Sequence, residues 1–365
     1  MDAGRVAWGL PGLGEGSREQ ALDSTRDSAR MPARGPGAWL PPVRHHGIPT
    51  LFDRPTRFKR PVLLIVGCGD IGLRVASLLR GRWRVLGLTT NSRRVPGLRA
   101  AGVRPLLGDL DQPGSLARLA DLADAVLHLA PPPDSGALDT RSANLVRALG
   151  RSSRLRRLVY ASTSGVYGDC GGERINETRA LRPATDRARR RVDAERRWRI
   201  FGRARGVAVT ILRIPGIYAP GRPGGDPRER LARAAPVLAG ADDVYTNHIH
   251  ADDLARACVA ALHRGLPQRA VHACDDSELR MGDYFDLAAD LFGMARPPRL
   301  TRGDAGAALS PLQMTFTSES RRLVNTRLKR ELRLALRFPT VREGLASASD
   351  RGAHVVAIDR RSVIP

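Results

Sequence analysis

The sequence predicts an α/β fold, built on a doubly wound parallel sheet with a smaller C-terminal lobe, and two observations carry this prediction. From Pro61 onward, short apolar runs alternate with segments of helical length, which is the pattern of parallel βαβ units. Beyond Pro215 the alternation weakens, and loops rich in proline and glycine appear, as at 220–227. We therefore expect the main domain to end near residue 215, with a strand or helix returning to it from the C-terminal part.

The first predicted elements surround a glycine turn. Val62 to Val66 is a continuous apolar run, which suits a strand buried on both faces of a parallel sheet. Apolar residues then recur at helical spacing from Ile71 to Leu79, and Gly81 is a suitable helix end. The second strand is predicted at 84–88.

The same alternation continues along the chain. Each apolar run has the length of a strand, and the segments between them are long enough for right-handed crossover helices. Strands are predicted at 103–107, 125–129, 155–161 and 207–212, and helices at about 93–101, 113–122, 137–150 and 185–204. In the C-terminal part, we predict helices near 252–264 and 281–292 and a strand at 270–274, with Asp252 or Asp253 as the N-cap of the first helix.

Composition narrows the function classes. The chain has 365 residues with 42% apolar content, enough to bury a sizeable core. Its formal charge of +23 could attract nucleic acid, but all the basic residues except Lys59 and Lys329 are arginine, and aromatics make up only 4%. No apolar run approaches the roughly 18 residues of a membrane span, and the first 30 residues lack the pattern of a secretory signal. We expect a cytoplasmic protein that binds neither nucleic acid nor a membrane.

No metal site is predicted. The cysteines at 68, 170, 258 and 274 form no C-x-x-C pair and have no matching histidine spacing. His248 and His250 face one side of any strand, but further ligands are missing, so a structural turn is the preferred interpretation. His128 and His272 lie on apolar strands and are expected in the core.

A glycine motif marks the strongest candidate site. Between the first strand and the first helix, the sequence has the G-x-G-x-x-G pattern, in which the glycines permit a tight turn, close approach to a pyrophosphate and close helix packing. The free N–H groups of the helix N-terminus then face the phosphates. The motif residues, all expected to contact the cofactor, are Gly67, Cys68, Gly69, Asp70, Ile71 and Gly72. This context predicts a Rossmann-like, dinucleotide-binding domain.

The end of the second predicted strand bears on the choice of cofactor. An acidic residue there would hold the ribose hydroxyls of NAD, but the chain has Thr89, Asn91, Arg93 and Arg94 instead. Hydroxyls and arginines suit a 2′-phosphate. The sequence therefore favours NADP over NAD.

Several motifs in the same order resemble one family. They are Gly108-Asp109-Leu110, His128-Leu129-Ala130-Pro131, Ala161-Ser162-Thr163-Ser164-Gly165-Val166-Tyr167-Gly168, Leu212-Arg213-Ile214-Pro215-Gly216-Ile217-Tyr218-Ala219-Pro220 and His248-Ile249-His250-Ala251-Asp252-Asp253-Leu254-Ala255. Over about 61–349 the chain resembles the extended short-chain dehydrogenase/reductase superfamily, also called the NAD-dependent epimerase/dehydratase family.

This resemblance implies roles for particular residues. Asp109 and Leu110 would flank the adenine, Ala130 and Pro131 would line the cofactor, and Pro215 to Ile217 would pass near the nicotinamide. Thr163 would hydrogen-bond a substrate carbonyl or alcohol. A hydroxyl that caps backbone at the strand end is the alternative for Thr163, and both interpretations stay open.

The chain departs from the family at its catalytic pair. Family members carry Tyr-x-x-x-Lys on the helix after this strand, where lysine lowers the tyrosine pKa. If the family's helix glutamate is Glu195, the pair is replaced by Arg187 and Arg191, and no lysine occurs between 60 and 328. These arginines could clamp an anionic substrate, but membership of a solvated, arginine-rich face is the preferred interpretation. The departure resembles an atypical, YeeZ-like subgroup.

Two classes of function remain. The first is an NAD(P)-dependent oxidoreductase or epimerase on a small carbonyl or sugar-like substrate, with Thr163 as its tentative catalytic residue. The second is a non-catalytic dinucleotide-binding sensor or regulator. The expected organisation is a disordered extension at 1–58, an NAD(P)-binding domain at 61–215, a substrate lobe at 216–349 and a tail at 350–365. The expected partners are the dinucleotide and a small-molecule substrate, with a homodimer as the candidate assembly.

Overall fold

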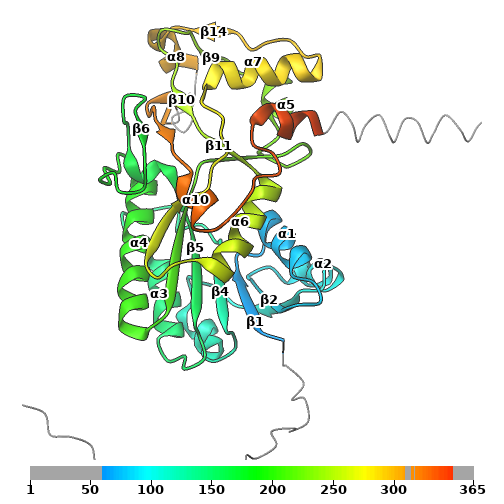
Figure 1. Cartoon of the computed structure of the whole chain (residues 1–365), viewed down its shortest axis with the longest axis vertical. Coiled ribbons are helices and arrows are strands. Elements are labelled where there is room, and N and C mark those ends of the chain that lie inside the picture. The colour runs from blue at the N-terminus through cyan, green and yellow to red at the C-terminus, as the bar shows by residue number, and fades with distance from the viewer. Residues whose placement is uncertain (1–59, 309–313, 316, 348–365) are drawn as a thin grey trace, which may run out of the picture. The chain divides into compact units, whose positions relative to one another are not determined.

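The computed structural model describes residues 60–308, 314–315 and 317–347, all within one compact unit, Arg57–Pro365 (Figure 1). The predicted extension at 1–58 and the predicted tail at 350–365 lie outside these residues. No helix in the described ranges is both long and apolar enough to cross a membrane.

A seven-stranded sheet forms the centre of the described chain. Every strand pairs in parallel with its neighbours, in the order β12-β7-β5-β4-β1-β2-β3. The strands are β1 (Val62–Val66), β2 (Arg84–Thr89), β3 (Arg104–Leu107), β4 (Ala125–His128), β5 (Arg157–Thr163), β7 (Ala208–Ile214) and β12 (Arg269–His272). The predicted doubly wound α/β fold is confirmed, and β12 returns to the sheet from the C-terminal part. The strand order reverses beside β1, where such sheets open a crevice.

Helices cover both faces of the sheet, as Figure 1 shows. On one face, α1 (Asp70–Leu78), α2 (Val95–Ala100) and α6 (Ala251–Arg264) pack over a core that includes Leu63 and Ile65. On the other face, α3 (Thr140–Leu149) and α4 (Asp186–Arg205) pack over Leu64 and Val66. Successive β1 residues thus point to opposite cores, which is why the whole strand is apolar. Each such buried side chain stabilises the fold by roughly 1.5–3 kcal/mol.

The C-terminal part adds further elements, several of which surround a third core cluster that includes Tyr218, Tyr284 and Phe285. Its helices are α5 (Pro227–Leu231), α7 (Met281–Phe292), α8 (Arg302–Ala308) and α10 (Thr326–Arg330). Its two-stranded pairs are β8 (Gly216–Tyr218) with β11 (His248–His250), β9 (Val237–Leu238) with β14 (Arg299–Leu300), and β10 (Tyr245–Thr246) with β13 (Leu279–Arg280). A further pair joins β6 (Arg174–Ile175), which follows β5, to β15 (Arg322–Leu323) around a separate cluster. Because β8 follows the end of β7 after the single residue Pro215, it begins at the sheet's carboxyl edge.

Two local predictions are wrong. The helix expected at 113–122 is the 3₁₀ segment η2 (Pro113–Leu119), which ends where Ala120 turns extended and Asp121 takes a positive φ of 57°. Helix α6 is capped neither by Asp252 nor by Asp253. The His250 ring accepts the cap hydrogen bond from the backbone N–H of Asp252, because its Nδ1 atom lies 3.2 Å from that nitrogen.

Candidate functional site

The glycine turn after β1 has the geometry that close backbone approach requires. Gly67 has φ +82°, and a Cβ there would lie 2.5 Å from the backbone nitrogen of Ala130. At Gly72, a Cβ would meet the Ile65 side chain at 3.2 Å, so this glycine sets the packing of α1 on β1. A Cβ at Gly69 would meet nothing within 4 Å, because this residue faces open space. The turn therefore leaves room on its outer side for a ligand.

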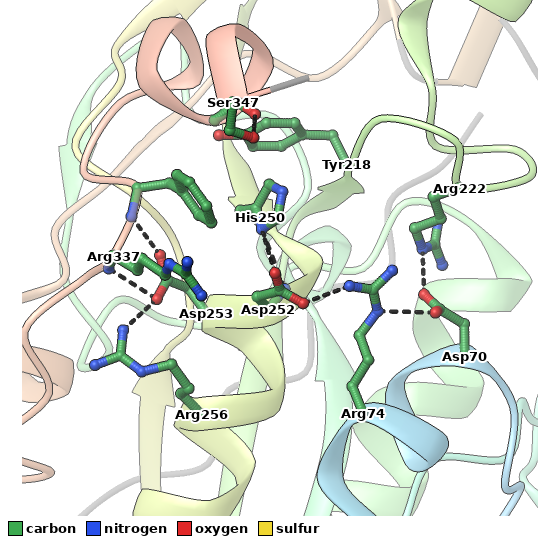
Figure 2. A network of polar contacts seen from close by, with 12 residues as sticks. Asp70, Arg74, Tyr218, Arg222, His250, Asp252, Asp253, Arg256, Arg337 and Ser347 are labelled. Carbon is green, nitrogen blue, oxygen red and sulfur yellow. Dashed lines mark hydrogen bonds and ion pairs between the residues drawn. The ribbon is translucent and has the colours of Figure 1, made fainter. Parts of the chain in front are cut away.

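Helix α1 begins in this open space without a side-chain cap, since its N-cap residue is Gly69. The first N–H groups of the helix are thus available to an anion. The carboxylate of Asp70 in the first turn is neutralised by two arginines, Arg74 at 2.8 Å and Arg222 at 3.0 Å. Arg222 comes from the loop after β8, and Figure 2 shows it reaching across to the start of α1.

Figure 2 also shows how this network continues into α6. Arg74 also pairs with Asp252, in the first turn of α6. The neighbouring Asp253 is fully buried and accepts hydrogen bonds from the backbone N–H groups of Arg337 and Phe338, at 2.9 and 2.8 Å. These contacts fix the C-terminal segment against α6, next to the glycine turn.

A cavity of about 220 Å³ lies beside the turn, at the carboxyl ends of β1, β2 and β3. Eight of the residues expected to contact the cofactor line this cavity: Gly67, Cys68, Thr89, Arg94, Asp109, Leu110, Ala130 and Pro131. The Arg94 guanidinium donates to the carbonyl of Cys68 at 2.7 Å, which holds it over the turn.

Asn91 and Arg93 are not among the residues that line it. Instead, the Asn91 side chain accepts a hydrogen bond from the backbone N–H of Arg93 and so caps η1 (Ser92–Arg94). Arg141, which sequence reasoning missed, lines the cavity and pairs with Asp111 at 2.7 Å. Its place on α3 gave no signal, because the chain is rich in arginine throughout.

A second cavity, of about 290 Å³, continues from the turn toward β5 and β7. It is lined by Gly67, Gly69, Asp70, Ile71 and Gly72 of the motif, by Thr163, Pro215 and Ile217 as expected, and by Arg187, Arg191 and Arg222. This cavity, the cofactor cleft, therefore collects the glycine turn and the residues expected near the nicotinamide. The buried Nε of Arg191 has no hydrogen-bond partner among the described residues. Open space at Gly69 and this unpaired donor fit a ligand with phosphate oxygens.

Thr163 ends β5 between this cleft and a larger cavity. Its hydroxyl accepts a hydrogen bond from the backbone N–H of Gly165 at 3.3 Å and caps η3 (Ser164–Tyr167), which is the structural role left open above. A hydroxyl that accepts one bond still has a proton to donate. The capping bond and a substrate contact are therefore compatible.

Arg187 and Arg191 lie on the first two turns of α4 and differ in environment. Arg187 lines both the cofactor cleft and the larger cavity. Arg191 turns inward and donates to the carbonyl of Ala161 at 2.7 Å and to the Tyr160 hydroxyl at 3.2 Å. The prediction that both belong to a solvated face is therefore wrong for Arg191, since the carboxyl end of β5 offers it acceptors. Exposed Arg189 and Arg196 fit that prediction.

The larger cavity, of about 610 Å³, lies between the sheet's carboxyl edge and the C-terminal elements. It is lined by five arginines, Arg187, Arg222, Arg230, Arg233 and Arg321, and by three acids, Asp226, Glu229 and Glu319. Two of these guanidiniums, of Arg230 and Arg321, have a buried Nε without a partner among the described residues. The cavity thus presents unused cationic donors. We call it the substrate cavity below.

A buried polar network supports the floor of the site. Glu195 accepts a hydrogen bond from Ser162 at 2.6 Å and two from Arg213, at 2.8 and 3.1 Å. Burial opposes ionisation of Glu195, but the Arg213 guanidinium holds the pKa of this carboxyl below its usual value. Arg213 also donates to the Tyr167 hydroxyl at 2.6 Å, which lies 2.5 Å from Nε2 of His272.

The histidines are structural in this arrangement. Nδ1 of His272 lies 3.0 Å from the Val324 carbonyl, so it carries the proton and Nε2 accepts from Tyr167. Burial lowers the pKa of His272 to about 3, as it does for His128 and His248. His248 stacks on Tyr284 with ring centroids 4.1 Å apart. Among the described residues, no group of three or more His, Cys, Asp or Glu could hold a metal ion.

A glycine turn at the switch point of a doubly wound parallel sheet, with cavities along the carboxyl ends of its strands, defines the Rossmann class of dinucleotide-binding proteins. The chain belongs to the NAD dependent epimerase/dehydratase family, whose model matches residues 63–274.

Solved structures share the fold of this chain. The chain is similar to a conserved protein of unknown function from Silicibacter pomeroyi DSS, with 28% identity and a TM-score of 0.65 over 80% of this chain and 99% of that chain. It is also similar to UDP-glucose 4-epimerase from Thermotoga maritima with UDP-glucose (18% identity, TM-score 0.65, 81% and 99% covered). A third similar structure is UDP-glucuronic acid 4-epimerase from Bacillus cereus in complex with NAD, with 17% identity and a TM-score of 0.63 over 78% of this chain and 96% of that chain. The last two likenesses concern the fold alone. No curated protein matches the chain.

Proposed function

We propose that the chain binds NADP in the cofactor cleft and acts as an oxidoreductase or epimerase on a small, anionic carbonyl or sugar-like substrate in the substrate cavity. One observation carries the proposal. Thr163 and Arg187, from β5 and α4, line both cavities, so a substrate group between them would lie against the cofactor and against two side chains at once. The proposal includes membership of the YeeZ-like subgroup.

The preference for NADP is supported by the end of β2. Arg94 lines the cavity of about 220 Å³ beside the glycine turn, and no acidic residue stands at the end of β2 to hold ribose hydroxyls. A guanidinium in this position suits a 2′-phosphate. The N–H groups at the start of α1 would hold the pyrophosphate.

When bound, the nicotinamide supplies a hydride donor or acceptor. Thr163 donates its hydroxyl proton in a hydrogen bond to the substrate oxygen and orients it. Arg187 stays protonated at all physiological pH values, so it binds and polarises an anionic group but does not transfer a proton. Water or the substrate itself exchanges the proton, because neither position of the family's catalytic pair carries a titrating side chain.

The test of this proposal combines binding and turnover. Calorimetry with NADP and with NAD measures the cofactor preference, and hydride transfer is followed across panels of sugars, sugar phosphates and keto acids. Thr163→Ala should reduce turnover about a hundredfold, the usual effect of deleting a donor to a reacting oxygen. Thr163→Ser, which keeps the hydroxyl, should retain most of the rate. Equal rates in wild type and Thr163→Ala would reject the assigned role.

A second function is a non-catalytic dinucleotide sensor. It is favoured by one observation, the two arginines at the positions of Tyr-x-x-x-Lys. Tight NADP binding with no turnover on any substrate panel, in both wild type and Thr163→Ala, is the result that would select it. Binding of neither dinucleotide would reject both functions.

A further inference from the structure

A separate cavity lies at the opposite end of the sheet from the glycine turn. It has a volume of about 340 Å³ and is formed at the amino ends of β1, β2 and β3, with the end of α1 beside it. Parallel strands of this length span roughly 17 Å. The separation exceeds the Debye length of about 8 Å at physiological salt, so a charge in this cavity is largely independent of the cofactor cleft.

Four arginines surround this amino-end cavity: Arg60, Arg80, Arg84 and Arg104. None of their guanidinium groups makes a hydrogen bond or ion pair with a residue that the structure describes. None of the described residues that line the cavity is acidic. Four exposed cations therefore line one cavity, in which the described residues supply no carboxylate.

An arginine elsewhere on the same edge of the sheet has the carboxylate partner that these four arginines lack among the described residues. Arg154, next to the amino end of β5, pairs with Asp124 at 2.7 Å. An arginine on this edge thus forms an ion pair where a carboxylate stands within reach. The charged side chains among the described residues that line the amino-end cavity are all arginines.

His263 lies beside the cavity, near three arginines that do not line it. Its ring lies 5.7 Å from Trp83, which lines the cavity. Burial lowers the pKa of His263, and the charges of Arg264, Arg157 and Arg82 lower it further. Arginines other than the four that line the cavity therefore lie around His263.

We propose that the amino-end cavity binds the phosphate groups of a small polyphosphate ligand, at a site distinct from the dinucleotide site. The planar guanidinium fork matches phosphate oxygens in pairs, so four arginines provide enough donors for two or three phosphate groups. The volume falls in the range of small-molecule sites, which start near 300 Å³. An inorganic polyphosphate and a nucleoside triphosphate share this chemistry. They differ in that only the nucleotide has a base, which could stack on the ring of Trp83 beside the cavity.

The test uses the full chain saturated with NADP, titrated by calorimetry with tripolyphosphate and, separately, with ATP. Arg80→Ala combined with Arg104→Ala should weaken tripolyphosphate binding at least tenfold. The matched control is Arg118→Ala combined with Arg203→Ala, because both residues are exposed, line none of the described cavities and remove the same charge. It should change the affinity less than twofold.

Comparing the two ligands shows whether the cavity prefers a nucleotide or phosphate groups alone. Tighter binding of ATP than of tripolyphosphate assigns a nucleotide, and equal affinity assigns phosphate groups alone. Equal losses in both double variants would overturn the site, because binding would then follow net charge. The site would also be overturned if neither tripolyphosphate nor ATP bound to the NADP-saturated wild type. The same holds if an oligonucleotide bound more tightly than either of them and its binding depended on Arg80 and Arg104. Circular dichroism and retained NADP affinity confirm that each variant is folded.

Discussion

Arg213 and Glu195 form a two-point ion pair in the interior, with Nη2 2.8 Å from Oε2 and Nε 3.1 Å from Oε1. Their side chains are only 3% and 1% exposed, so neither charge has water as an alternative partner. The pair joins β7 to α4 directly under Ser162, which precedes Thr163. The position of the candidate catalytic hydroxyl therefore depends on a buried charge pair.

Removing one partner of this pair should be costly. Arg213→Met would leave the buried Glu195 carboxylate with only the partly exposed Arg199 as a counter-charge. We therefore expect the free energy of unfolding to fall by about 3–5 kcal/mol. Arg199→Met is the control, because Arg199 contacts the same carboxylate at 3.2 Å but is 26% exposed. It should cost less than about 1 kcal/mol. Urea denaturation measures both, and similar costs would contradict the assigned role of burial.

The strands of the sheet could be predicted from the sequence because burial on both faces requires a continuous run of apolar residues. All five residues of β1 are apolar and buried, so composition alone identifies the strand. The short strand pairs of the C-terminal part have no such apolar run. In β8 and β11 only three residues pair on each side, and their register follows from tertiary packing.

The site was predictable only where function requires a local pattern. The glycine motif is such a pattern, because its spacing encodes the turn itself. Arg222 is not, since it meets Asp70 across 152 positions of sequence. The only signal for Arg222 was its place in the Pro- and Gly-rich loop that follows a family motif. Likewise, Arg93 and Arg94 look equivalent in sequence, and only the 3₁₀ turn that Asn91 caps separates them.

The difference between these two arginines can be tested. Arg94→Ala should lower the affinity for NADP about tenfold and change the affinity for NAD little, because only NADP carries the 2′-phosphate. Arg93→Ala, the adjacent control, removes the same charge from a residue that does not line the cavity. Calorimetry with both dinucleotides measures the ratio. An equal change of that ratio in both variants would show that local net charge sets the preference.

Gly67 is the position of the turn least tolerant of a side chain. Gly67→Ala should abolish dinucleotide binding and destabilise the fold, because the new Cβ would lie 2.5 Å from a backbone nitrogen at a positive φ. Gly97→Ala is the matched control, since a Cβ at Gly97 in α2 meets nothing within 4 Å. It should be neutral or stabilise the protein by up to about 1 kcal/mol. Thermal unfolding with and without NADP separates the two effects.

Acid should destabilise the protein through its buried histidines. Burial lowers the pKa of His128, His248 and His272 from 6.5 to about 3. Below about pH 6.5 the unfolded chain therefore takes up protons that the folded chain excludes, and stability falls as the pH falls. The expected loss is about 1.4 kcal/mol per pH unit for each histidine until its folded pKa is reached.

A variant isolates one of these groups. His248→Phe keeps a ring stacked on Tyr284 and removes the titrating nitrogen. Between about pH 6 and pH 5 the slope of unfolding free energy against pH should decrease by about 1.4 kcal/mol per unit relative to wild type. An unchanged slope would mean that His248 is protonated in the folded state.

The pairing of Arg222 with Asp70 sets the charge beside the expected pyrophosphate. Asp70 stands in the first turn of α1, where a carboxylate alone would repel the phosphates that the helix N-terminus attracts. Arg74 and Arg222 offset that charge, and Arg222 also lines the substrate cavity. Arg222→Ala should therefore weaken NADP binding about three- to tenfold, with a larger loss at low salt, where charges are less screened.

A second substitution distinguishes this charge effect from the loss of a direct contact. In the double variant with Asp70→Asn, the carboxylate is gone, so the arginine is no longer needed to neutralise it. We expect NADP affinity to return to within about twofold of wild type, a strong coupling between two residues in contact. If affinity stays low in the double variant, Arg222 binds the pyrophosphate directly. Calorimetry at two salt concentrations decides whether Arg222 neutralises Asp70 or binds the pyrophosphate directly. Only in the first case does removal of the Asp70 carboxylate abolish the defect of Arg222→Ala.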